Sequence, residues 1–577
     1  MRHTVNPRQG RLFDPFDGMI PPLGRDRIHQ GWQGIFRSML LELMPAQQLG
    51  MHFSPTIGRP TKELYSVAGL LFLQEFQNWT IPEAVDAYLF RTDIQFALNL
   101  EPGVDEMCER TLERYRALFL EDEGAGQVMQ DVTDRLIDLL ELDIAKQRLD
   151  STHVFSNMAS FGRTRLMAVT IKRFLTQVKR HHWSDFEALP AELRQRYAPS
   201  QAQLLSKESK DADGRAKSRR QVAEDLRHLI DRFADHAGLR DRPSYQALVT
   251  VFTQQCEIVE GRVEVRSKTG GACVQNPSDL DATYDGKKGQ GYQAQFSETC
   301  SDANEVQLIV SALPQTAVES DANALPPVLE DLQKRELLPE EMLADTSYGS
   351  DDNVQKAAVL DVEVVSPVSG PTTTPEQDAN GEGIAKLTID DFAVDERTGK
   401  VEACPAGRVP LQVVYDAETT TTTIHMSPED CGACPFRAQC PVENGKTTCK
   451  VSYTDKQKRL EGRRREQETD VFRQRYAKRS GLESTNSGVK RRLGLGQLRV
   501  RGRRAVNHAI YLKVAGWNLL RAAASGKLRA RVAQRLASFG AALIFCLAYA
   551  VGNLPCRGQR SAKTNRRVHA IPNDSAG

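Results

Sequence analysis

Three acidic residues, far apart in the sequence, have the residue type and the setting for metal-dependent phosphate chemistry. Asp150 and Asp345 each follow a short apolar stretch and stand beside small hydroxyl residues, in RLDST and LADTS. Glu483 lies in a segment rich in cations, YAKRSGLESTNSGVK. Carboxylates at the ends of strands and helices are the hard ligands that two divalent ions need for phosphodiester cleavage. An aspartate after a strand is also a common turn residue or helix N-cap, so neither aspartate is decisive alone.

The neighbours of Glu483 make it the most specific of the three. On one continuous helix, Tyr476, Arg479, Glu483 and Lys490 would fall within an arc of about 60°. If these residues are only structural, this face is a surface ion-pair network. In the functional interpretation Glu483 binds metal, while Arg479 and Lys490 grip phosphates on either side. Gly488 is expected to weaken the helix after Glu483, which makes the position of Lys490 the less certain part.

The spacing Y-x2-R-x3-E-x6-K resembles the signature of a large group of bacterial insertion-sequence transposases of the DDE type. The resemblance extends over roughly residues 50 to 525 and includes DST, a Gly-Tyr strand near Gly291 and AD-x-x-YGS. It implies an α/β fold: an RNase H-like catalytic core with helical and β-rich insertions, preceded by an all-α N-terminal domain. It also implies Asp150, Asp345 and Glu483 as the catalytic triad, binding Mg²⁺ or Mn²⁺, with Tyr476, Arg479 and Lys490 as DNA contacts.

Length and pattern predict several domains, because 577 residues exceed what one core usually organises. Helical spacing before residue 140, with Pro82 in the first turn of a helix after Thr80, predicts an all-α start. The charged stretch SKESKDADGRAKSRR is expected to be an exposed connection. The expected parts are residues 1–140, a helical DNA-binding domain; 141–370, the first part of the core, with a helical insertion at about 155–270; 371–455, a β-rich insertion that contains cysteines; 456–530, the basic helical part with Glu483; and 531–577, a tail.

Charge is unevenly distributed, although the formal net charge is only +1. Between Asp455 and Ala505 there are 17 Lys and Arg against 6 Asp and Glu. Such a block is suited to binding a polyanion, because neutralising the charges of the polyanion releases its bound counterions. The alternative is that the block forms a solvated basic surface. The first residues lack an apolar signal core, and the run Ala541–Val551 is short for a membrane span. We therefore expect a cytoplasmic, nucleoid-associated protein that has no membrane partner.

Clustered cysteines in such a compartment indicate metal rather than disulfides. The sequence predicts a structural Zn²⁺ site from Cys404, Cys431, Cys434 and Cys440, with Cys449 or His425 as substitutes. Unligated thiols are the alternative. The dispersed residues, which are expected to be packing residues, are Cys108, Cys256, Cys273, Cys300, Cys546 and Cys556.

The expected function is metal-dependent cleavage and strand transfer of insertion-sequence DNA ends. The partners would be terminal inverted repeats and target DNA, bound by a homodimer. A catalytically inactive or domesticated DNA-binding relative is the main alternative, and a stand-alone nuclease of the same fold is a further one. Asp279 and Asp281 are kept as a reserve acidic pair, and Tyr476 as a covalent nucleophile is a formal alternative.

Overall fold

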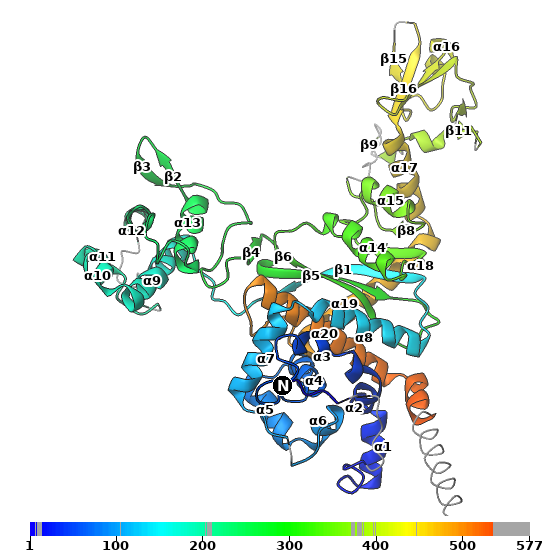
Figure 1. Ribbon diagram of the computed structural model, residues 1–577. Helices are drawn as coiled ribbons and strands as arrows, with labels where there is room; N and C mark the ends of the chain where they lie inside the picture. Colours follow the sequence, from blue (N-terminus) through cyan, green and yellow to red (C-terminus); the bar gives the residue numbers. More distant parts are fainter. Residues whose placement is uncertain are drawn as a thin grey trace, which may run out of the picture.

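The computed structural model describes residues 1–534 apart from residues 6, 8–13, 104, 202, 205–210, 371–375, 378–382, 385, 396, 399 and 446. Its centre is a mixed sheet (Figure 1) of strand order β4-β5-β1-β7-β8, in which β6 also pairs with β5. The strands are β1 (Lys146–Val154), β4 (Thr283–Asp285), β5 (Gly289–Thr299), β6 (Ile309–Thr316), β7 (Glu341–Ala344) and β8 (Glu363–Val365). The sheet is therefore assembled from segments that insertions separate in the sequence.

The direction of pairing changes at β1. Strand β5 is antiparallel to both β1 and β6, whereas β7 is parallel to β1 and to β8. The ladder between β1 and β5 continues from Gln147 to Val154, but the ladder between β1 and β7 ends at the pair Leu149–Ala344. Beyond that pair, β1 has β5 on one side and the chain leaving β7 on the other.

The described region before β1 contains these helices: α1 (Pro22–Gln30), α2 (Trp32–Ile35), α3 (Ala46–Gly50), α4 (Leu64–Phe76), α5 (Ile81–Phe90), α6 (Thr92–Ala97), α7 (Glu109–Glu121) and α8 (Ala125–Leu140), with a short π-helix, η1 (Phe36–Leu40), and a 3-10 turn, η2 (Leu41–Leu43). Thr80 caps α5 in a reciprocal capping box with Glu83, and Pro82 lies in the first turn. Helix α4 is apolar on nearly all sides, which suits a buried helix. One hydrophobic core joins these helices to the sheet and to the C-terminal helices.

The basic C-terminal part is helical. It contains α17 (Asp455–Gln467), α18 (Asp470–Ala477), the 3-10 turn η5 (Lys478–Ser480), α19 (Gly481–Arg492) and α20 (Arg503–Ala524). Helix α20 packs against α8, α4 and β6, between the N-terminal helices and the sheet. Helices α14 (Leu325–Lys334) and α15 (Asp351–Ala358) pack on β6 and β8, and the turn η3 (Asp321–Asn323) precedes α14. Over the described residues, none of the helices has the length and apolar character needed to cross a membrane. Of the predicted tail, residues 531–577, only residues 531–534 are described; the run Ala541–Val551, Cys546 and Cys556 lie outside the described residues.

The first insertion extends to one side of the sheet (Figure 1) and has a hydrophobic core of its own. Its elements are α9 (Arg163–His181), α10 (Trp183–Glu187), α11 (Ala191–Arg196), α12 (Ala212–Phe233), α13 (Pro243–Gln255), β2 (Cys256–Val259) and β3 (Arg262–Val265). The prediction of an exposed connection is wrong from residue 212 onward, because ADGRAKSRR forms the start of α12. The side chain of Asp211 caps this helix, and apolar residues further along it anchor it in the insertion core.

The cysteine-bearing insertion stands at the far end of α17 (Figure 1) and is rich in strands. Its elements are β9 (Glu376–Gln377), β10 (Gly383–Ile384), the turn η4 (Ile389–Asp391), β11 (Ala393–Val394), β12 (Val401–Ala403), β13 (Gln412–Asp416), β14 (Thr421–Met426), α16 (Pro428–Gly432), β15 (Glu443–Asn444) and β16 (Cys449–Thr454). A four-stranded sheet, β13-β14-β16-β15, leads directly into α17 through the capping residue Thr454. Helix α17 thus connects this insertion to the central sheet.

A buried lysine joins three parts of the main core. The Lys513 ammonium, which is 1% exposed, donates to the carbonyl oxygens of Glu75 (3.0 Å) and Leu493 (2.8 Å) and to Asn78 Oδ1 (3.1 Å). It also lies 3.4 Å from the Glu75 carboxylate, and burial lowers its pKa. Lys513 therefore links α20 to α4 and to the end of α19.

Replacing Lys513 by Met should destabilise the protein strongly, because the Glu75 carboxylate and two buried carbonyls would lose their partner. We expect the free energy of unfolding to fall by about 3 kcal/mol in chemical denaturation. Lys527→Met, which removes a solvent-exposed partner of Glu141, is the control and should leave stability nearly unchanged. An equal loss in both variants would contradict this role of Lys513.

Candidate active site

The register of the sheet brings Asp150 and Asp345 together. Leu149 and Ala344 are the last pair of the ladder between β1 and β7, and the two aspartates are the residues that follow them. Asp345 stands directly after its strand, as predicted. Asp150 does not end its strand: it is in the middle of β1, which continues to Val154 because β5 keeps pairing with it. The polar residues after Asp150 suggested a strand end, but backbone pairing extends the strand through them.

The Arg479 guanidinium lies among the three predicted acids. Its Nη2 is 3.3 Å from Asp150 Oδ1 and 4.0 Å from Asp345 Oδ2, and its Nη1 is 3.7 Å from Glu483 Oε1. Buried Nε of the same guanidinium has no hydrogen-bond partner among the described residues. The triad predicted from residues 150, 345 and 483 therefore converges on one cation, from β1, from the end of β7 and from α19.

The three acids differ in how far they are open to solvent. The Asp150 side chain is 19% exposed, against 47% for Asp345 and 68% for Glu483. Burial raises the pKa of Asp150; Arg479 counteracts the rise, and the charges of Asp345 and Asp321 add to it. Across the described chain the three carboxylates do not themselves close to within 4.8 Å of one another. The site thus combines one largely buried carboxylate, Asp150, with two solvent-accessible ones.

Tyr476, Arg479, Glu483 and Lys490 do not share one continuous helix. Helix α18 ends at Ala477 and α19 begins at Gly481, with a 3-10 turn between them. The four residues still face one region: Asp345, Asp150 and Glu483 all contribute to the raised pKa of Tyr476, whose main cause is burial. Burial lowers the pKa of Lys490, and attraction to Asp150 opposes that change.

Gly488 does not weaken α19, which continues to Arg492. A Cβ at this position would come 2.4 Å from the Trp517 ring of α20, so the glycine allows the two helices to approach closely. Lys490 is consequently held on a regular helix. The expectation was wrong because helix propensity is outweighed here by tertiary packing.

A buried ion pair that sequence reasoning missed fixes the Glu483 helix to the sheet. Arg148, two residues before Asp150 on the same face of β1, donates to Glu298 Oε2 from Nε (2.8 Å) and Nη2 (2.6 Å). Its Nη1 donates to the Lys478 carbonyl (2.8 Å), while the Thr485 hydroxyl donates to Glu298 Oε1 (2.7 Å). A Cβ on Gly481 would lie 1.9 Å from Arg148 Nη1. Arg148 therefore binds the turn before Glu483, and Glu298 binds the helix just after it, so the two residues fix the backbone on both sides of Glu483.

A second polar network lies on the opposite face of β1. The Lys288 ammonium donates to Ser151 Oγ (3.0 Å), to Gln293 Oε1 (2.8 Å) and to Asp321 Oδ2 (3.1 Å). Gln295 also donates to Asp321 (2.9 Å). The Ser151 hydroxyl, beside Asp150, is thus hydrogen-bonded to both Lys288 and Asp321. The alternation of side chains along β1 was the available signal for both networks.

The reserve acids Asp279 and Asp281 do not join the triad. Asp279 is buried and accepts hydrogen bonds from Ser156 Oγ (2.7 Å) and from the Tyr292 hydroxyl (2.6 Å). Asp281 accepts from the backbone N–H of Arg503 (3.0 Å) at the start of α20. Both are structural residues.

One group of possible metal donors is found in the described chain by distance alone: His182, Asp185 and His236 of the helical insertion. The backbone N–H of Gly238 donates to His236 Nδ1 (3.2 Å), which leaves the proton of the neutral ring on Nε2. Nε2 then faces Asp185 Oδ2 at 3.3 Å as a donor. This pattern describes a hydrogen-bonded pair, since a metal would need the lone pair of that nitrogen.

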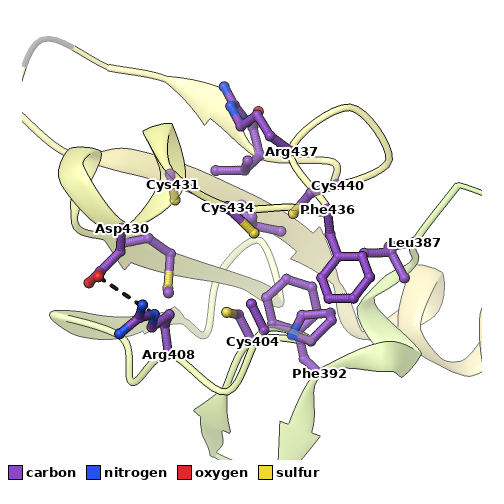
Figure 2. A pocket seen from close by; sticks show the side chains of 15 residues that line it. Leu387, Phe392, Cys404, Arg408, Asp430, Cys431, Cys434, Phe436, Arg437 and Cys440 are labelled. Carbon is purple, nitrogen blue, oxygen red and sulfur yellow. Dashed lines mark hydrogen bonds and ion pairs between the residues drawn. The ribbon is translucent and has the colours of Figure 1, made fainter.

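The cysteines predicted to bind zinc line a single small cavity in the strand-rich insertion (Figure 2): Cys404, Cys431, Cys434 and Cys440. Burial raises the pKa of Cys431 to about 11 and also raises that of Cys440. Of the dispersed cysteines, Cys256 and Cys300 are buried as expected and Cys273 is half-buried. Cys108 is exposed and so is not the packing residue that was expected.

Comparison with known proteins gives one family. Residues 403–523 match the family described as Transposase DDE domain. The matched segment contains the four cysteines of the cavity, Arg479, Glu483 and nearly all of α20, whereas Asp150 and Asp345 lie outside it. No curated protein matches the sequence. The cryo-EM structure of a piggyBac transposase synaptic complex with hairpin DNA aligns with 92% of this chain and 81% of that chain, at 7% identity and a TM-score of 0.26, which is too low to define a common fold.

Replacing Arg148 by Met should destabilise the protein in a pH-dependent way. Burial already raises the pKa of Glu298, and Arg148 is the main opposing influence. Without it, the folded state holds the Glu298 proton more tightly than the unfolded chain does. The loss of stability should therefore grow as pH rises above the usual glutamate pKa, to about 3 kcal/mol near neutral pH, and shrink in acid.

Denaturation measured at several pH values tests this, with two companion variants. Lys146→Met, on the same strand and 4.0 Å from Glu341, should change stability little. Adding Glu298→Gln to Arg148→Met should remove the pH dependence. If Arg148→Met lowers the free energy of unfolding by the same amount at every pH, Glu298 is not the group left unpaired.

Proposed function

We propose that the chain is a DDE transposase that cleaves and joins DNA ends, with Asp150, Asp345 and Glu483 as its metal-binding triad. The observation that carries the proposal is the convergence of these acids on Arg479, at 3.3, 4.0 and 3.7 Å, from segments far apart in the sequence. The match of residues 403–523 to the Transposase DDE domain family supports it independently. The strand order β6-β5-β1-β7-β8, in which β5 is antiparallel to its neighbours β1 and β6 while β7 and β8 are parallel to β1, supports an RNase H-like core.

The donor set fits divalent cations of the Mg²⁺ or Mn²⁺ kind. All three donors are hard carboxylates, and Asp150 suffers repulsion from Asp345 and Asp321 that a cation would relieve. Two of the carboxylates are accessible to solvent. When bound, such ions activate a water or a 3′-hydroxyl as nucleophile and stabilise the leaving oxygen.

The protein's own groups would bind and orient the DNA. Arg479 is only loosely paired with the acids, and its Nε lacks a partner among the described residues, so it can turn its donors to a phosphate. Lys490, half-buried beside Asp150, would neutralise a neighbouring phosphate. Tyr476 stacks on Phe472 with ring centres 5.7 Å apart, which fixes its hydroxyl near the triad. Terminal repeats and target DNA bound by a homodimer complete the proposal.

Glu483→Gln should abolish cleavage and strand joining while leaving DNA binding intact. The variant keeps the shape but loses a charged ligand, and we expect a fall of about 100-fold or more, since metal-ion stabilisation supplies several kcal/mol. The assay uses DNA from the ends of the element with Mg²⁺ or Mn²⁺. Glu468→Gln, an exposed acid at the end of α17, is the matched control. Cleavage that survives Glu483→Gln would rule out this residue as a ligand, and a wild-type protein that binds DNA without cutting it would favour an inactive relative.

Lys490→Gln should weaken DNA binding about equally for end DNA and for unrelated DNA. Losing one phosphate contact should reduce the slope of log K against log salt concentration by about 1. Fluorescence anisotropy at several salt concentrations measures both effects. Lys356→Gln, on the exposed side of α15, is the control. An unchanged salt slope would remove Lys490 from the DNA contacts.

A further inference from the structure

Four cysteines from two segments of the strand-rich insertion surround one cavity. Cys404 follows β12, and Cys431, Cys434 and Cys440 come from α16 and the loop after it. Figure 2 shows their sulfur atoms turned toward the same space. Cys449 and His425, which the sequence allowed as substitutes, do not line this cavity. Four of the five thiols therefore line the cavity, while the fifth, Cys449, interacts with Cys431 from outside it.

Tight turns present these thiols. In the segment Cys404-Pro-Ala-Gly, the N–H of Gly407 (φ +73°) donates to the Cys404 carbonyl (2.8 Å), and the Cys404 N–H donates to the Arg408 carbonyl (2.9 Å). The Cys434 N–H donates to the Cys431 carbonyl at 3.4 Å. Only glycine adopts the positive φ of residue 407 without strain. Both ligand-bearing turns are therefore fixed by the backbone.

The cavity has the size of a single small occupant. Its volume is about 20 Å³, whereas a water molecule requires roughly 10–15 Å³. Leu387, Phe392, Met426 and Val451 line it together with the four cysteines. Thiolates bind a soft or borderline metal ion well in such surroundings.

Nearby cations suit a bound thiolate cluster. Arg408 lies at the cavity and pairs with Asp430 at 3.7 Å (Figure 2). Arg437 also lines the cavity. Four thiolates around a divalent ion carry a net negative charge, which these guanidinium groups would offset.

The described part of the insertion has only a small core. Among its described residues the buried apolar cluster has ten members: Ile389, Phe392, Val401, Ile424, Met426, Cys431, Val442, Cys449, Val451 and Tyr453. A core of this size rarely stabilises an independent unit, and small domains commonly add a metal or disulfides. All five cysteines of the insertion are free thiols. A metal would supply the missing stabilisation.

We propose that Cys404, Cys431, Cys434 and Cys440 bind one structural Zn²⁺ ion. Within the described chain no three of these sulfurs lie within 4.8 Å of one another. Ligation at Zn–S distances of about 2.3 Å would draw them together by rotation of the side chains. The site lies beyond α17, away from the acidic triad, and does not depend on the proposed catalytic function.

The test is metal analysis of the full-length chain purified under reducing conditions. We expect one Zn²⁺ per chain, released by a mercurial reagent, and after exchange for Co²⁺ an absorption spectrum typical of tetrahedral thiolate ligation. Serine substitution at Cys404, Cys434 or Cys440 should lower zinc content at least tenfold. Cys449→Ser replaces a buried thiol that interacts with that of Cys431 but does not line the cavity, so it should retain one ion. Cys273→Ser, in the other insertion, is the control.

Two results would overturn the proposal. One is a wild-type chain that neither contains Zn²⁺ nor takes up Co²⁺ in the tetrahedral form, a measurement that needs no variant to fold. The other is loss of zinc from Cys449→Ser together with retention in Cys404→Ser, which would indicate another ligand set. Neither result bears on cleavage by the acidic triad, so the two proposals can fail separately.

Discussion

The ion pair between Arg148 and Glu298 is the interaction on which the site depends. Glu298 is 1% exposed, and a buried charge is tolerated only when it is paired and hydrogen-bonded. Arg148 meets that need and also binds the Lys478 carbonyl, while Thr485 binds the other oxygen of Glu298. The turn between α18 and α19 must therefore lie against β1 and β5, and Gly481 allows it to approach that closely. The position of Glu483 follows from this contact.

The same strand organises the rest of the site through its alternation. Arg148 and Asp150 point to the face that η5 and α19 cover, whereas Ser151 points to the face of Lys288 and Asp321. The ladder with β7 ends one residue before Asp150, which brings Asp345 alongside. Three independent constraints (a buried ion pair, strand alternation and a ladder end) thus meet within a few residues of β1.

Local pattern was sufficient for some of these features and not for others. The helical start, the strand before Asp345 and the cationic surroundings of Glu483 follow from spacing, and the structure contains them. The middle position of Asp150 depends on pairing with β5, more than 140 residues away, which no local pattern contains. Gly488 was misjudged for a similar reason, since its role is set by Trp517 on another helix. The cysteine spacing identified five thiols, but only the folded cavity separates Cys449 from the other four.

The basic block after residue 455 is not simply a polyanion-binding surface, because several of its cations are paired within the protein. Arg459 pairs with Asp351 (2.7 Å), Arg463 donates to the Gly349 carbonyl (2.9 Å), and Arg475 pairs with Glu341 (2.9 Å). These cations fasten α17 and α18 to the edge formed by β7, β8 and α15, so they are not simply available to a polyanion. Because that docking carries η5 to the end of β7, the block contributes first by placing Arg479 among the three acids. In the proposed function, direct contact with DNA would fall to the few cations that face the acids, Arg479 and Lys490 among them.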